Sequence, residues 1–367
     1  MNRRDILRGA AMTGAAAVLT PETLWAAAAS DWTLGLADVE ADIAPTSLAL
    51  VHGRAPTDLK GTLFRNGPAK FRRPGGSVGH WFDGDGMVRK FQVADGEARM
   101  SARFVDTVKR RQDAAANAVI TPGYGTAAGP GARVGSADDA NAANTSVMMA
   151  GGELWALWEG GSPTAMDPVS LETRGFKTIS PDMKGMPFLA HPRVQPDGSV
   201  WNLGLAGKRA VVWNLSPDGG LRKAEVITLP RAGYMHDFTA TERSLIIILQ
   251  PWVQEGMRMP IASTMVWRPE LGAQVLVLDK NDLSKRRLFE LPPFFFFHLG
   301  DAWEEADGTI RFDACIDKDP FGTAANGGAI LRGERLRAAP PRRALITLRG
   351  DGRAELATDT VSAEFPR

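Results

Sequence analysis

Residues 292–305 read PPFFFFHLGDAWEE, in which four consecutive phenylalanines lead to a histidine and then to a polar, acidic segment. A run this apolar predicts a buried β-strand. The histidine, His298, is one of five in a chain of 367 residues. A single imidazole at the end of a buried strand is either a packed core group or a ligand in a dry pocket, and this stretch taken alone favours the core group.

Outward from this stretch, the chain repeats short β-rich runs that are separated by turns. Asp-Gly pairs, which supply the positive φ angles of tight hairpin turns, occur within residues 94–96, 196–198, 217–219, 306–308 and 350–352. The strand candidates between the turns include residues 153–158, 199–205, 244–250, 273–279, 309–317 and 343–349. No long segment keeps a helical period, so we expect an all-β fold. Hairpins over such a length favour a β-propeller over a sandwich.

Composition narrows the classes of function. The 43 basic and 42 acidic residues nearly cancel, so the net charge gives no indication of a nucleic-acid partner. Cys315 is the one cysteine, which excludes an internal disulfide and any cluster held by several thiolates. A bound metal would therefore need imidazole or carboxylate ligands.

Residues 1–29 differ in character from the rest of the chain. Arg3 and Arg4 precede a short apolar run at residues 9–19, and small residues follow at 26–29. This pattern is typical of a Tat-type signal peptide, and the apolar run is too short to span a bilayer. We expect residues 30–367 to form the folded domain and the protein to be periplasmic.

Two stretches depart from the pattern of alternating strands and turns. Residues 112–144 are rich in Ala, Gly, Asp and Asn and are predicted to be a surface loop. Residues 252–267 mix Trp, Met and Ile without clean alternation. They are interpreted as a connecting loop over the core or, alternatively, as the wall of an apolar tunnel or a lip that touches a membrane.

Three histidines are candidates for a metal site. His191, His236 and His298 follow one another at intervals of 45 and 62 residues, roughly one propeller blade each. Equivalent positions in successive blades converge on the propeller axis, where three imidazoles could hold Fe(II), Zn or Cu. Glu159 and Glu364 are candidates for the carboxylates that accept the other ring N–H of such ligands. The spacing alone leaves this site and a purely structural role open.

Blocks of sequence along most of the chain resemble one known family. They are GTLFRNGP (61–68), HWFDGDGM (80–87), ANT (143–145), ALWEGG (156–161), AHP (190–192), HDF (236–238), FFH (296–298), AWE (302–304) and EFPR (364–367). In this order and number they resemble the carotenoid cleavage oxygenases. The resemblance implies a seven-bladed β-propeller with a non-haem iron held by four histidines on the axis.

The resemblance also assigns roles to particular residues. His191, His236 and His298 match the first three iron ligands, and Glu159 and Glu364 match two of the three glutamates that hydrogen-bond the ligands. His80 belongs to a block that is structural in the family, and His52 matches nothing and is expected at the surface. In the family, further residues with the fourth histidine follow the EFPR block. We therefore expect a C-terminally truncated, incomplete propeller, and an inactive remnant or a non-catalytic binder of apolar ligands is the alternative.

The implied reaction is Fe(II)-dependent cleavage of a conjugated C=C bond with O2 to give two carbonyl products. Relatives that cleave stilbenoids hold the phenol with a lysine and a tyrosine, at positions that match Trp158 and Phe104 here. Neither side chain can replace them, which favours a carotenoid or apocarotenoid over a stilbenoid. Phe238 and Leu299 are further candidates for lining the substrate tunnel, although packing explains them equally well.

Two further expectations follow from this chemistry. A polyene substrate this apolar favours peripheral contact with a membrane. A zinc hydrolase is a third hypothesis, because three histidines and a water form a known catalytic zinc site. Analysis of the bound metal separates it from the oxygenase.

Overall fold

The computed structural model describes residues 32–366 apart from 257, 323 and 335–338, so the expected signal peptide at residues 1–29 lies outside the described residues. The described chain forms five four-stranded antiparallel sheets and two short two-stranded ones. Within the described residues, no helix is both long and apolar enough to cross a bilayer.

The five large sheets follow one another along the chain. In spatial order, sheet 1 contains β1 (Ile43–Ser47), β6 (Glu97–Phe104), β5 (Asp85–Ala94) and β2 (Gly61–Lys70), and sheet 2 contains β10 (Thr173–Phe176), β9 (Thr164–Met166), β8 (Glu153–Leu157) and β7 (Ser146–Ala150). Sheet 3 contains β11 (Arg193–Val194), β12 (Val200–Ala206), β13 (Arg209–Leu215) and β14 (Leu221–Thr228). Sheet 4 contains β15 (Thr239–Ala240), β16 (Ser244–Leu249), β19 (Ala273–Asp279) and β20 (Arg286–Leu291). Sheet 5 contains β21 (Phe295–Glu304), β22 (Ile310–Asp317), β23 (Arg342–Leu348) and β24 (Ala354–Ser362).

The remaining elements are short. They are the pairs β3 (Arg72–Arg73) with β4 (Gly76–Ser77) and β17 (Trp252–Gln254) with β18 (Met265–Trp267), the helices α3 (Val108–Ala115) and α4 (Gly327–Leu331), and the 3-10 turns η2 (Trp32–Leu36), η3 (Trp81–Asp83), η4 (Ala137–Ala140), η5 (Pro181–Met183), η6 (Ile261–Thr264) and η7 (Pro269–Leu271).

All five Asp-Gly turns join antiparallel neighbours, as predicted. Only at Asp95-Gly96 do both residues have positive φ, 54° and 80°. At the other four turns the glycine alone does, and the aspartate carboxylate accepts a backbone N–H two residues on, as Asp197 does from Ser199 at 2.9 Å. There the aspartate acts through its side chain rather than through its backbone conformation.

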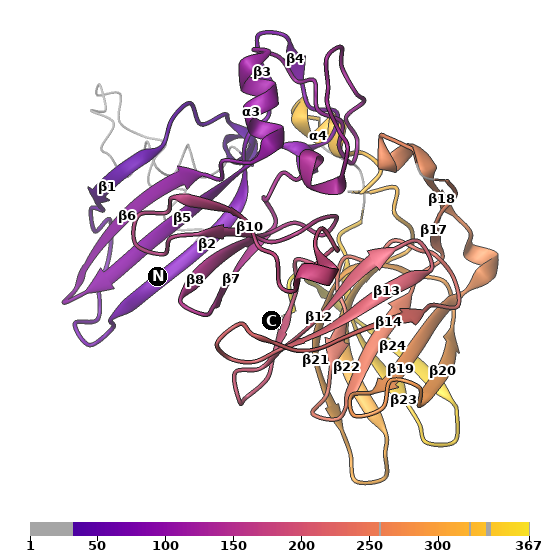
Figure 1. The fold of residues 1–367 in the computed structure, drawn as a ribbon. Helices are drawn as coiled ribbons and strands as arrows, with labels where there is room; N and C mark the ends of the chain where they lie inside the picture. The colour runs from indigo at the N-terminus through magenta and orange to yellow at the C-terminus, as the bar shows by residue number, and fades with distance from the viewer. Residues whose placement is uncertain (1–31, 257, 323, 335–338, 367) are drawn as a thin grey trace, which may run out of the picture.

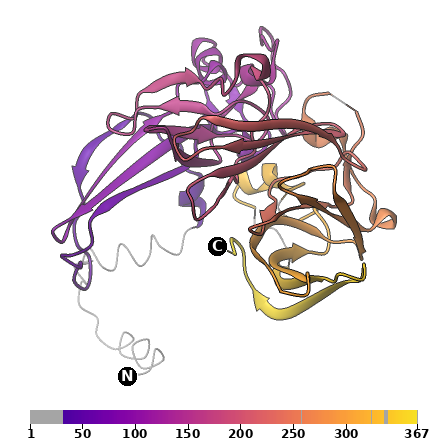
Figure 2. The same ribbon diagram turned by 60° about the horizontal axis from the view of Figure 1, so that its bottom comes forward.

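The sheets are arranged as blades. Figures 1 and 2 show them following one another around an arc in chain order, from the indigo first sheet to the yellow last one. Apolar residues of each sheet pack against those of the next, as Ile246 and Val275 of sheet 4 pack with Phe296 and Phe312 of sheet 5. The prediction of an all-β propeller is confirmed. Five blades are seen in the described residues, whereas seven are implied by the resemblance.

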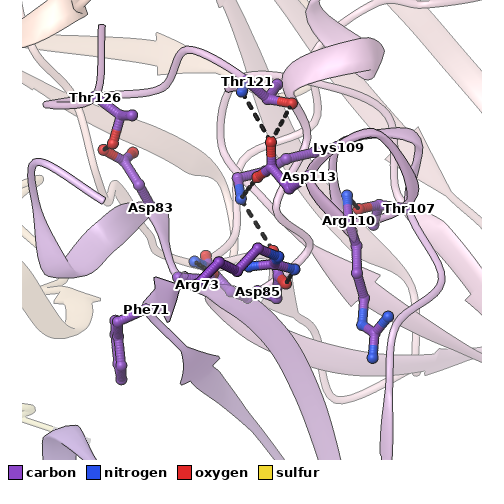
Figure 3. Close-up of polar contacts among 12 residues, drawn as sticks. Phe71, Arg73, Asp83, Asp85, Thr107, Lys109, Arg110, Asp113, Thr121 and Thr126 are labelled. Atoms are coloured by element: carbon purple, nitrogen blue, oxygen red, sulfur yellow. Dashed lines mark hydrogen bonds and ion pairs between the residues drawn. The ribbon is translucent and has the colours of Figure 1, made fainter. Parts of the chain in front are cut away.

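A cap of loops and short helices lies on one side of the blades, at the top of Figure 1. Residues 112–144 belong to it. The prediction of a surface loop is confirmed for residues 127–137, which are mostly exposed, whereas residues 121–124 and 140–144 are buried. The Asp83 carboxylate accepts the backbone N–H groups of Tyr124 and Gly125 at 2.6 and 2.9 Å, and Asp113 accepts that of Thr121 at 2.8 Å (Figure 3). These carboxylates satisfy backbone groups that would otherwise need water.

Residues 252–267 leave sheet 4 as the hairpin β17–β18. Trp252 is buried, and Met265 and Trp267 are partly buried against the same apolar cluster, which includes Phe295 and Phe297 of the opening stretch. The hairpin therefore packs on this cluster, and a role as a tunnel wall or a membrane-touching lip stays a prediction.

Candidate metal centre

The three predicted histidines are held by edge strands of three successive sheets. His191 lies two residues before β11, His236 lies three residues before β15, and His298 lies within β21. Each of these strands is the first of its sheet along the chain and lies at one edge of that sheet. A blade places the start of such a strand near the axis, so residues far apart in sequence meet there.

The imidazoles form a compact cluster. The Nε2 atoms of His191 and His236 are 2.9 Å apart, and the ring centroids of the three histidines lie 4.5, 5.0 and 5.0 Å from one another. One ligand nitrogen from each ring lies within 4.8 Å of the other two. His236 and His298 are buried, and His191 is partly buried.

This donor set fits a transition-metal ion. Nitrogen ligands lie about 2.1 Å from such an ion, so two ligands at right angles are about 3.0 Å apart. The 2.9 Å between the Nε2 atoms of His191 and His236 matches this separation. Imidazole suits iron, zinc and copper alike, so the donor atoms define the class of metal and not the element.

Two glutamates orient two of the rings. The Nδ1 atom of His236 lies 2.8 Å from Oε2 of Glu159, and Nδ1 of His298 lies 2.8 Å from Oε2 of Glu364. A carboxylate can only accept a hydrogen bond, so each ring carries its hydrogen on Nδ1 and keeps the Nε2 lone pair for the cluster. Glu159 follows β8 of sheet 2, and Glu364 follows β24 of sheet 5. The structure thus places both predicted glutamates beside the histidines.

A tyrosine hydroxyl also forms a hydrogen bond with Glu159. The Tyr234 hydroxyl donates to Oε1 of Glu159 at 3.0 Å, while His236 uses Oε2 of the same carboxylate. Burial opposes the charged form of His236, but the Glu159 carboxylate outweighs it and raises the pKa of His236 above its usual value. Burial, reinforced by Glu159, raises the pKa of Tyr234 well above 10, so its hydroxyl stays a donor.

Aromatic side chains surround one side of the cluster. Phe297 lies 5.4 Å from the His236 ring and 4.9 Å from Phe295, and Tyr234 lies 4.9 Å from Trp252. Tyr124 and Phe82 of the cap extend the same group of rings. The four phenylalanines of the opening stretch therefore divide by strand alternation. Phe295 and Phe297 join this aromatic group, whereas Phe294 and Phe296 enter the core between sheets 4 and 5.

The four residues predicted to line a substrate tunnel do not share one location. Phe238 and Leu299 are fully buried in the apolar clusters between successive sheets, so the structure shows packing for both. Phe104 is buried in sheet 1 beneath the Arg110 guanidinium, 4.3 Å from its ring centroid. Trp158 pairs with Phe188 through an isolated β-bridge next to Glu159. Leu299 directly follows His298, and Trp158 directly precedes Glu159.

The other two histidines lie outside the cluster. His80 is buried at the start of η3, where its Nδ1 accepts the Phe82 N–H and its Nε2 faces the Ala324 carbonyl. His52 is exposed. The sequence analysis did not single out Tyr234, although the rarity of tyrosine in this chain was a signal that could have done so. The chain has two tyrosines, Tyr124 and Tyr234, and both stand in the aromatic group beside the histidines.

Comparison with known proteins then identifies the family. Residues 36–367 match the family described as retinal pigment epithelial membrane protein (RPE65). The chain belongs to this family. Its curated relatives include the carotenoid isomerooxygenase of Galleria mellonella, 26% identical over 73% of this chain, and the apocarotenoid-15,15'-oxygenase of Synechocystis, 28% identical over 74% of it. The resemblance to the carotenoid cleavage oxygenases is confirmed.

The solved structures agree with the fold. The cobalt-substituted apocarotenoid oxygenase of Synechocystis superposes with a TM-score of 0.76 at 25% identity, over 89% of this chain and 72% of that one. The matches cover 58% and 59% of the length of the two curated relatives, so the chain spans less than two thirds of each.

Proposed function

We propose that this protein is an Fe(II)-dependent dioxygenase that cleaves a conjugated C=C bond of a carotenoid or apocarotenoid with O2. The observation that carries the proposal is the cluster of three histidines, two of them oriented by glutamates. Membership of the family and the names of the curated relatives support the same reaction.

His191, His236 and His298 would hold the iron. A bound Fe(II) supplies a redox-active centre for O2 chemistry that the side chains lack. Because these ligands are neutral, the ion keeps its full charge. Glu159 and Glu364 fix the tautomers of two ligands, and the rings of Phe297, Tyr234 and their neighbours keep water from one side of the cluster.

The reaction needs no further reductant. The C=C and O–O bonds break, two C=O bonds form, and each product takes one oxygen atom, so atoms and electrons balance. An apolar polyene fits a site whose neighbours are mostly hydrocarbon rings. Trp158 and Phe104 do not supply the lysine and tyrosine that hold a phenol, which favours a polyene over a stilbenoid. Peripheral contact with a membrane stays a prediction.

The test is to load the metal-free chain with Fe(II) and supply β-carotene, an apocarotenal or a hydroxystilbene under ¹⁸O2. We expect O2 uptake with the first two and two aldehydes that together contain all the carbons of the substrate, each labelled with ¹⁸O. The variant His236→Ala is the control and should give neither. Stoichiometric zinc in the isolated protein, with no O2 uptake after iron loading, would favour the hydrolase.

A non-catalytic binder of apolar ligands makes a different prediction. If the protein only binds the polyene, the added polyene would quench the tryptophan fluorescence of the protein while the polyene absorbance stayed constant, with iron or without it. Fluorescence and absorbance recorded on one sample therefore decide between binding and cleavage.

A further inference from the structure

A buried ion pair lies directly behind the three histidines. Arg193 and Asp237 pair through the arginine NH2 group at 3.0 Å from Oδ1, and both side chains are almost completely excluded from solvent. We propose that this pair, here called the Arg193–Asp237 clasp, is the positioning device that sets the spacing of the metal ligands. The inference rests on the proposed function and names the residues that keep its site in shape.

Asp237 joins the segments that carry two of the ligands. Its Oδ1 accepts the backbone N–H of Phe238 at 2.8 Å, and its Oδ2 accepts the N–H of Leu299 at 2.9 Å. Leu299 directly follows His298, and Asp237 directly follows His236. One carboxylate therefore ties the backbone beside one ligand in sheet 4 to the backbone beside another in sheet 5.

Arg193 brings in the third ligand segment. It lies two residues after His191, and its Nε donates to the Phe238 carbonyl at 2.6 Å. Its NH2 group donates to the Leu299 carbonyl at 3.0 Å, and NH1 lies 3.5 Å from the Gly300 carbonyl. The rigid fork of the guanidinium thus spans all three segments, which a single ammonium group could not do.

The strands alone hold two of these segments weakly. β11 and β15 consist of two residues each, so few ladder hydrogen bonds fix the backbone next to His191 and His236. A metal site requires its ligands to be held within about 0.5 Å of the productive geometry. These backbone contacts of the clasp fall within two residues of a ligand, so the clasp supplies the restraint that the short strands lack.

A second buried ion network provides a matched control. Lys109 pairs with Asp85 at 2.9 Å and with Asp113 at 3.0 Å, all three side chains being buried between sheet 1 and the cap. Breaking either network leaves an uncompensated buried charge and destabilises the fold. Only the clasp contacts the ligand segments, so metal affinity separates a positioning role from general stability.

The experiment titrates Co²⁺ into the metal-free full chain and into Arg193→Met, Arg193→Lys and Lys109→Met, following visible absorption and, separately, thermal unfolding without metal. We expect Arg193→Met to weaken cobalt binding by about 10- to 100-fold, as changes behind metal ligands generally do. Arg193→Lys should fall between Arg193→Met and the wild type. Lys109→Met should bind cobalt as the wild type does, despite its lower melting temperature.

Hydrogen exchange of the metal-free proteins gives an independent readout. The amides of Phe238 and Leu299 should exchange faster in both Arg193 variants than in the wild type and should be unchanged in Lys109→Met. Equal cobalt affinity in the wild type and in a folded Arg193 variant overturns the proposal, as does a wild-type chain that binds no cobalt. O2 uptake and aldehyde formation enter neither measurement, so a failure of the proposed reaction is recognised separately.

Discussion

His236 and His298 each use Nδ1 for a hydrogen bond to a glutamate and keep Nε2 for the cluster. This division fixes which nitrogen carries the hydrogen, and it explains why a carboxylate stands behind each ring. Phe365 lies flat against the His298 ring, with centroids 4.2 Å apart, and so adds a packing restraint next to Glu364. At the scale of single residues, the orientation of the imidazoles therefore depends on groups behind the rings, which would not touch a bound metal.

Replacement of Glu159 by glutamine tests this dependence. The amide keeps the size of the side chain but loses its charge, and it can accept only one of the hydrogen bonds from His236 and Tyr234. We expect metal affinity to fall by about 10- to 100-fold in a titration with Co²⁺. Glu153→Gln is the control, because Glu153 begins β8, the strand that Glu159 follows. Glu153 pairs with Lys177 and Arg174, and its loss should leave cobalt binding unchanged.

The buried His80 is expected to make the stability of the fold depend on pH. Burial lowers its pKa to about 4, against a smaller opposing effect of Asp83. Between pH 6.5 and 4 the unfolded chain then binds a proton that the folded chain does not. The free energy of unfolding should fall as the pH drops through this window, by at most about 3 kcal/mol, and level off below it. Denaturant titrations of the wild type and of His80→Gln should differ in this slope, and equal slopes would contradict the assignment.

Among the elements, helix α3 depends on a buried ion network for its place against sheet 1. Lys109 of α3 reaches Asp85 of β5, which also pairs with Arg73 (Figure 3). Burial opposes the charge on Asp85, but Lys109 and Arg73 outweigh it and lower the pKa of the carboxyl group. The network therefore remains ionised at neutral pH and joins the cap to the first blade.

Lys109→Met removes the central cation of this network. Two buried carboxylates are then left with incomplete compensation, and we expect the free energy of unfolding to fall by about 3–5 kcal/mol. Urea denaturation followed by far-UV circular dichroism measures the change. The double variant Lys109→Met/Asp113→Asn should recover part of the loss, because it also removes one of the stranded charges and keeps an oxygen that can accept the Thr121 N–H. A double variant no more stable than the single one would show that Asp113 is compensated in another way.

At the scale of the whole molecule, successive blades bring sequence-distant segments together. Glu159 and His236 are separated by 77 positions, and Arg193 and Leu299 by 106, yet both pairs are in hydrogen-bond contact. No single blade contains a complete centre. Metal binding and folding of the described domain are therefore expected to be coupled.

Export to the periplasm stays a prediction. The proposed Tat-type signal depends on Arg3 and Arg4, which lie outside the described residues. Arg3→Lys together with Arg4→Lys keeps the charge but removes the twin arginine that the pathway reads. In a bacterial host we expect the protein to shift from the periplasmic to the cytoplasmic fraction. An unchanged distribution on immunoblots of the two fractions would contradict Tat export.

Much of the local structure, and the family, could be predicted from the sequence. Asp-Gly turns fix hairpins through backbone conformation and neighbouring hydrogen bonds. Short apolar runs indicate buried strands, and β19 was predicted in this way at residues 273–279 and found there. The sequence blocks also identified the histidines and glutamates. The burial of residues 121–124 and 140–144 was not predicted, because distant carboxylates such as Asp83 allow such backbone to be buried.

The tertiary structure alone decided how the centre is built. The distances among the imidazoles, the Tyr234 contact to Glu159 and the Arg193–Asp237 clasp all join residues of different segments or sheets. No local pattern encodes these contacts, because they depend on how twisted blades pack around an axis. The same packing assigned Phe238 and Leu299 to the core and Phe297 to the aromatic group beside the histidines, a division that strand alternation and packing set together.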